Sequence, residues 1–134
     1  MKRRGLAVVW GAATALALSA PVLAHHSFAA EFDADKPVTV KGVITSVRLE
    51  NPHSWFFLDV AGTDGKVEKW AFEASTPSSL IRSGFKPGTV KAGDEVTIKG
   101  YHARDANAYA GAARELQMAD GRAFAIGPQV GPVR

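Results

Sequence analysis

Histidine stands at three places in this chain, and the first place is a pair, His25-His26, that follows Ala24. An export signal would be cut directly after Ala24, which makes His25 the first residue of the mature protein. Its free amine and its imidazole then belong to one residue, and such nitrogen ligands bind Cu(II) more strongly than other divalent metals of the first row. The sequence therefore offers a chelating group for copper at the N-terminus of the exported form.

The expectation of export rests on the order of residue types at the start of the chain. Lys2 to Arg4 form a basic start, Leu6 to Leu18 is an uncharged apolar stretch, and Pro21 precedes the small residues at the cut. The apolar stretch is shorter than the roughly 20 residues of an ordinary membrane span. We therefore expect residues 1–24 to be a cleaved signal peptide and the mature protein to be periplasmic, without stable membrane insertion.

Cleavage also changes the charge of the chain. Lys and Arg together number 16 against 13 Asp and Glu, and Lys2, Arg3 and Arg4 account for that whole excess. The mature chain is therefore neutral, which argues against nucleic acid as a partner, because nucleic-acid binding needs a basic surface that displaces counterions from phosphate. The chain has no cysteine, so disulfides and thiolate metal sites are excluded.

A histidine brace is the copper site that these residues favour. In a brace, the amine and Nδ1 of the first residue join a nitrogen of a distant histidine in a T-shaped set. His53 is the preferred distant ligand, because Pro52 fixes the backbone before it and its turn can approach the mature N-terminus. His26 and His102 are the alternatives.

Other interpretations of the histidines stay open. Zinc is the second choice of metal, since Glu31 or Asp33 can join the histidines in a tetrahedral site. The histidines can also be polar residues of a terminus and a loop, because no known ligand spacing such as His-Glu-x-x-His is present. The metal-binding prediction therefore rests on the position of His25 at the cut.

Short strands separated by turn signals are the elements that must position these residues. Runs rich in β-branched or alternating residues predict strands over 38–49, 54–60, 66–74, 96–102, 114–118 and 122–126. Gly42 in the first strand predicts a bulge or sharp bend. Thr76 as cap, Pro77 as first residue and Gly84 as stop predict one short helix after the third strand.

This order of elements, three strands, a short helix and two strands, is typical of an OB-type barrel. The last predicted strand adds a small terminal hairpin. We therefore expect an all-β chain with one short helix, in which residues 25–37 form an N-terminal segment, residues 38–126 an OB-like β-barrel domain and residues 127–134 a flexible tail.

Several short motifs are spread over the mature chain, and together they carry a resemblance. They are His25-His26-Ser27-Phe28, Glu31-Phe32-Asp33, Asn51-Pro52-His53-Ser54-Trp55, Trp70-Ala71-Phe72-Glu73 and Gly93-Asp94-Glu95-Val96. With these motifs the chain resembles the DUF6152 family of small exported bacterial proteins, over nearly the whole mature sequence. The family is a domain of unknown function, so the resemblance implies export and assigns no activity.

A binding module without a metal is the alternative function. Trp55, Trp70 and Tyr101 lie on predicted strands and can form a stacking surface for a small molecule, a glycan or a protein partner, as OB barrels do for oligosaccharides. Aromatic residues that alternate along strands also form barrel cores, and the face of the third strand that holds Trp70 and Phe72 is expected to point inward.

An enzyme is the least supported class of function. The chain has no cysteine nucleophile, no Gly-x-Ser-x-Gly elbow and no phosphate-binding glycine loop. The expected function is therefore that of a non-enzymatic periplasmic copper carrier or sensor, whose partner is the metal ion or another periplasmic protein.

Overall fold

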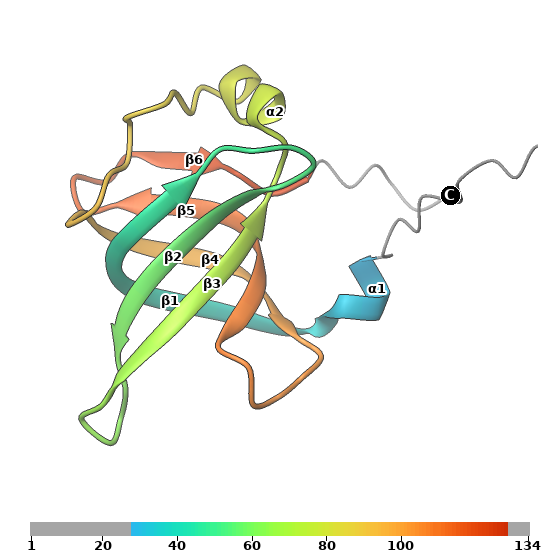
Figure 1. Cartoon of the computed structure of the whole chain (residues 1–134), viewed down its shortest axis with the longest axis vertical. Coiled ribbons are helices and arrows are strands. Elements are labelled where there is room, and N and C mark those ends of the chain that lie inside the picture. Colours follow the sequence, from blue (N-terminus) through green and yellow to red (C-terminus); the bar gives the residue numbers. More distant parts are fainter. Residues whose placement is uncertain (1–27, 129–134) are drawn as a thin grey trace, which may run out of the picture.

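The computed structural model describes residues 28–128, which form two short helices and one sheet that closes on itself (Figure 1). In chain order the elements are α1 (Phe28–Glu31), β1 (Phe32–Arg48), β2 (Ser54–Ala61), β3 (Val67–Ala74), α2 (Pro77–Arg82), β4 (Glu95–Ala103), β5 (Ala110–Met118) and β6 (Ala123–Ala125). The strand order is β3-β2-β1-β4-β5-β6, and a parallel pairing of β3 with β5 closes five strands into a ring. The predicted OB-like all-β barrel is confirmed.

Strand β1 joins the two halves of the barrel. Its first part pairs with β4, its last part pairs with β2, and Val43 is paired on both sides. The register with β2 shifts between Ile44 and Ser46, so the bulge lies after the predicted position at Gly42. Gly42 instead permits a close approach of β2, because a Cβ there would lie 2.6 Å from the carbonyl oxygen of Asp59.

Strand β5 begins at Ala110, four residues before the predicted start, and small residues form its first half. These residues lie between β3 and β4, where a Cβ at Gly111 would be 2.6 Å from the carbonyl oxygen of Tyr101. A Cβ at Gly100 would overlap the carbonyl oxygen of Ala112. The sequence predicts no strand before residue 114 because these residues have low β propensity, whereas their small size is what lets the barrel close.

The core fills the inside of the ring, and α2 covers one end of it. The aromatic face of β3 points inward as expected, since Phe72 is fully buried and Trp70 is 9% exposed. The predicted cap of α2 is confirmed, because the Ser79 amide donates to Thr76 Oγ1 at 3.3 Å. Leu80 then inserts from α2 into the core.

Helix α1 corrects the expectation of a single helix. It is one turn long, too short to be stable through its own propensity, and contacts with the barrel hold it. The Phe28 ring lies 5.4 Å from that of Phe32 and meets Tyr101 edge-on at 5.9 Å. The Arg104 amide donates to the Glu31 carbonyl at 2.9 Å. Strand β1 consequently begins six residues before the predicted start, at Phe32.

No helix within residues 28–128 has the length and apolar character that crossing a membrane requires.

Candidate functional site

His53 lies on the connection between β1 and β2, and its side chain is 51% exposed. Its Nδ1 contacts Oε1 of Glu73 on β3, whose side chain is only 14% exposed. Glu73 points to the outer face of the barrel because it alternates with the buried residues Phe72 and Ala74. A carboxylate at Nδ1 favours the tautomer that carries the proton there, which leaves the lone pair of Nε2 for a metal.

The outer face that carries Glu73 on β3 extends across β5 and β4 to α1. The sheet register pairs Glu73 with Ala112 on β5, and Ala112 with Tyr101 on β4. The Phe28 ring of α1 packs on Tyr101. Because neighbouring strands lie about 4.8 Å apart, two strand spacings, roughly 10 Å, separate the backbones of Glu73 and Tyr101. The beginning of the described chain is therefore anchored on the side of the barrel that carries His53.

The predicted ligands His25 and His26 lie outside the described residues. For the part of the chain that the structure does describe, no three His, Asp or Glu side chains group as a metal site requires. Of the predicted ligands, the structure therefore places His53 with a carboxylate partner, Glu73, that was not among them.

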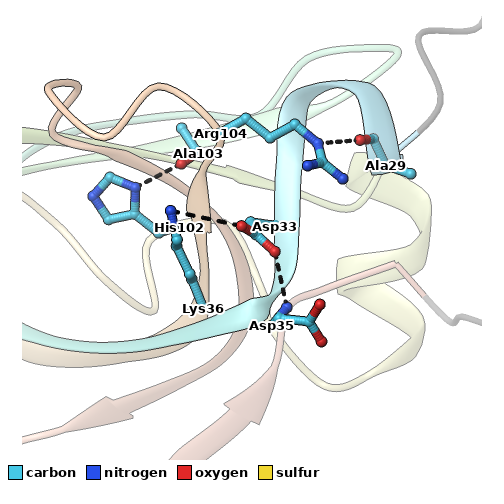
Figure 2. A network of polar contacts seen from close by, with 7 residues as sticks. All are labelled: Ala29, Asp33, Asp35, Lys36, His102, Ala103 and Arg104. Atoms are coloured by element: carbon cyan, nitrogen blue, oxygen red, sulfur yellow. Dashed lines mark hydrogen bonds and ion pairs between the residues drawn. The ribbon is translucent and has the colours of Figure 1, made fainter.

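Two of the alternative ligands, His102 and Asp33, lie near the junction of α1 with β4 and have local partners (Figure 2). His102 stands edge-on to the Trp70 ring at 5.6 Å, and its Nδ1 lies 2.7 Å from the Ala103 carbonyl oxygen. The Asp33 carboxylate lies 3.7 Å from Lys36 Nζ and accepts a hydrogen bond from the Asp35 amide at 3.0 Å. Glu31 ends α1.

The three predicted stacking residues lie on different parts of the barrel. Trp70 belongs to the core, where its ring stacks on Phe72 at 5.5 Å and its Nε1 donates to Glu68 at 3.0 Å. Tyr101 is half-buried, and Phe28 packs against it. Trp55 is half-buried on the outward side of β2. The structure thus does not gather these three rings into one surface.

A groove of about 400 Å³ on the outer face of β1, β2 and β3 was missed from the sequence. The Phe57 ring lies in it, stacked against Trp55 at 6.4 Å with an angle of 21° between the rings. The guanidinium carbon of Arg48 lies 5.2 Å from the centre of the Phe57 ring. The alternation of Trp55 and Phe57 with buried neighbours was the available signal. The place of Arg48 depends on the register after the bulge in β1.

Comparison with known proteins gives a family without an assigned activity. A family model described as a family of unknown function, DUF6152, matches residues 13–112. The match includes β1 to β4 and the first residues of β5, and so both His53 and Glu73. No curated protein and no solved structure matches the chain.

Proposed function

The chain belongs to the DUF6152 family, whose function is unknown, and we propose that it is an exported periplasmic protein that binds one copper ion in a histidine brace. The amine and Nδ1 of His25 supply two ligands, and Nε2 of His53 supplies the third. The observation that carries the proposal is the contact between His53 and Glu73. Histidines that bind metals commonly hold a carboxylate at the other ring nitrogen in this way.

Chain length supports a site that joins the N-terminus to His53. His25 precedes Phe28 by three residues in the sequence, and three residues span at most about 11 Å. Phe28 packs on Tyr101, whose backbone is roughly 10 Å from that of Glu73. A chain of this length can span the two strand spacings between Tyr101 and Glu73, which supports a brace that includes His53.

The donor set favours copper over zinc. Three nitrogens in a T-shaped set suit Cu(II), whereas zinc prefers four ligands in a tetrahedron. The carboxylate nearest to His53 is Glu73, and it contacts Nδ1, where it orients the ring. An exposed imidazole at the surface of a small barrel suits a carrier or sensor that exchanges its metal with another protein.

A competition titration with Cu(II) tests the proposal on protein whose mass shows that it begins at His25. We expect one ion per chain and a loss of affinity of at least 100-fold in His53→Gln. His102→Gln is the matched control and keeps the affinity, because the His102 ring packs against the core residue Trp70 and its Nδ1 lies at the Ala103 carbonyl oxygen.

A second form of the protein separates a brace from a site made of imidazoles alone. Acetylation of the His25 amine turns it into an amide nitrogen and should weaken copper binding by at least 100-fold. Equal affinity with and without the acetyl group contradicts the brace. Equal affinity in His53→Gln and the native protein contradicts the role of His53.

A further inference from the structure

The groove on the outer face of β1, β2 and β3 contains a cation without an opposite charge beside it. Lys69 and Asp59 in the groove pair with each other at 3.2 Å. Arg48 makes no ion pair with any residue from 28 to 128, and its guanidinium lies over the Phe57 ring. The groove therefore holds one net positive charge, and the donors of that guanidinium are available to an acceptor.

An aromatic strip adjoins this cation. Trp55 and Phe57 stack on each other on the outer side of β2, and the neighbour of Phe57 across β3 is the small residue Ala71. Because Ala71 has only a methyl group, it leaves part of the half-buried Phe57 ring open beside the Arg48 guanidinium. On the β1 side, Thr45 and Ser46 are exposed and add hydroxyl groups to the wall.

We propose that this groove binds an acidic saccharide, with its carboxylate on Arg48 and the C–H face of a sugar ring on the strip of Trp55 and Phe57. A guanidinium fork matches a carboxylate in two parallel hydrogen bonds. The hydroxyl groups of Thr45 and Ser46 in the wall can form hydrogen bonds with the hydroxyl groups of a sugar. The inference rests on the groove alone and is independent of copper binding.

Two other anionic partners fit the groove less well. An extended acidic peptide would bind by adding a strand, but the aromatic residues of the groove lie on β2, which pairs with β1 on one side and with β3 on the other and so has no open edge. A nucleic acid would need a broad basic surface, whereas the mature chain is neutral and the groove has a single unpaired cation.

The test compares two ligands with the same sugar backbone, one with charged carboxylates and one with neutral methyl esters. Metal-free mature protein in EDTA is titrated with a four-residue oligogalacturonate and with its methyl ester, and binding is followed through tryptophan fluorescence and calorimetry. We expect the acid to bind about tenfold more tightly than the ester, since bonds to charged groups contribute differences of this order. Salt should reduce the difference, because the site is open to solvent.

Variants at Arg48 identify the cation. Arg48→Gln should remove the preference for the acid, and Arg48→Lys should keep part of it. Lys41→Gln is the control. It removes an exposed cation of β1 that lies outside the groove and pairs with Glu95 of β4, and it should not change the preference for the acid. Thermal unfolding of each variant checks that the barrel is intact.

Equal binding of the acid and the ester, or an unchanged preference in Arg48→Gln, would overturn the proposal. Absence of binding to either saccharide would do the same. Tighter binding of oligo-glutamate or of a thymidine oligonucleotide would assign the groove to a different class of ligand and also overturn it.

Discussion

The contact between Glu73 and His53 determines which imidazole nitrogen is available to a metal. With the Glu73 carboxylate at Nδ1, the lone pair of a neutral ring lies on Nε2. Glu73 also limits the rotation of the ring, so less side-chain entropy is lost when the ring binds a metal. A residue that is not itself a ligand can therefore raise copper affinity.

Replacing Glu73 by Gln should lower Cu(II) affinity by about 10-fold to 100-fold, as expected for the loss of a carboxylate partner of a metal-binding histidine. The competition titration measures the change. Glu50→Gln is the control, because Glu50 is an exposed carboxylate three residues before His53. If Glu73→Gln and Glu50→Gln bind copper equally well, Glu73 does not position His53.

At this scale the sequence supports the choice of His53 but cannot identify its partner. The motif with Pro52 and Trp55 marks His53 as a residue on a constrained turn. Its pairing with Glu73 depends on the register of β2 against β3, in which Trp55 lies opposite Glu73. A shift of one residue would turn Glu73 inward, and the sequence of either strand alone does not fix that register.

Among the elements, β5 shows how small residues close a barrel. Gly100 and Ala112 lie on neighbouring strands so close together that no side chain fits at position 100. The pairing of β4 with the first half of β5 therefore depends on the absence of a side chain at Gly100 and at Gly111. This is also why strand propensity did not predict it, while the turns and the cap of α2 were predictable from local residue types.

Gly100→Ala should lower the free energy of unfolding by about 2–3 kcal/mol, because the new methyl group forces β4 and β5 apart. Urea denaturation followed by fluorescence measures this. Gln117→Ala, an exposed change on the neighbouring strand β5, should stay within about 0.5 kcal/mol of the native protein. Equal stability of Gly100→Ala and the native protein would show that β4 and β5 tolerate a wider spacing.

Helix α1 connects the start of the described chain to β4. Phe28 packs on Tyr101, and the Arg104 side chain also donates to the Ala29 carbonyl. In the proposed copper protein this attachment restricts the volume that the N-terminal amine can explore. The attachment therefore raises the effective concentration of the amine near His53, and with it the affinity for copper.

Phe28→Ala should weaken Cu(II) binding by about tenfold without changing the number of ions per chain, since it loosens the attachment and leaves every ligand in place. Hydrogen exchange at the Arg104 amide, which bonds to Glu31, should become faster in the same variant. Faster exchange with unchanged copper affinity would separate α1 from the metal site.

The turn between β5 and β6 offers a test of local electrostatics. The Arg122 amide donates to Asp120 Oδ1 at 3.0 Å, and Arg122 Nε donates to Oδ2 at 2.8 Å. These two bonds hold the pKa of Asp120 below its ordinary value, and the bond from the backbone amide has the larger effect. The ionised carboxylate therefore stabilises the turn above the ordinary pKa, and this contribution disappears as the pH falls through the lowered pKa.

Arg122→Gln should raise the pKa of Asp120 yet leave it below its ordinary value, because the backbone N–H of residue 122 remains. A carboxyl-carbon NMR titration of both proteins measures this. A pKa that stays the same in the variant would show that the guanidinium contributes nothing to the turn.

At the scale of the whole molecule, the order of strands and one helix was enough to predict an OB-like barrel, since few closed arrangements accommodate three strands, a helix and two strands in so short a chain. The second helix, α1, was not predictable, because contacts with Tyr101 and Arg104 rather than local propensity form it. The groove likewise depends on strands that are distant in the sequence.

The barrel brings two surfaces together around Trp55. On one side lies the pair of His53 and Glu73, and on the other lies the groove with Phe57 and Arg48. Both depend on the outer face of β2 and β3, because the inner face is fully used for the core. In our account the barrel is a scaffold that leaves its outer face for binding.

The most direct test is the Cu(II) EPR spectrum of the mature protein, labelled with ¹⁵N-histidine and verified by mass to begin at His25. We predict one copper ion per chain with hyperfine coupling to three nitrogens, of which one is lost in His53→Gln. Several weak copper species, or the same nitrogen coupling in native and His53→Gln protein, would contradict a copper site built on His53.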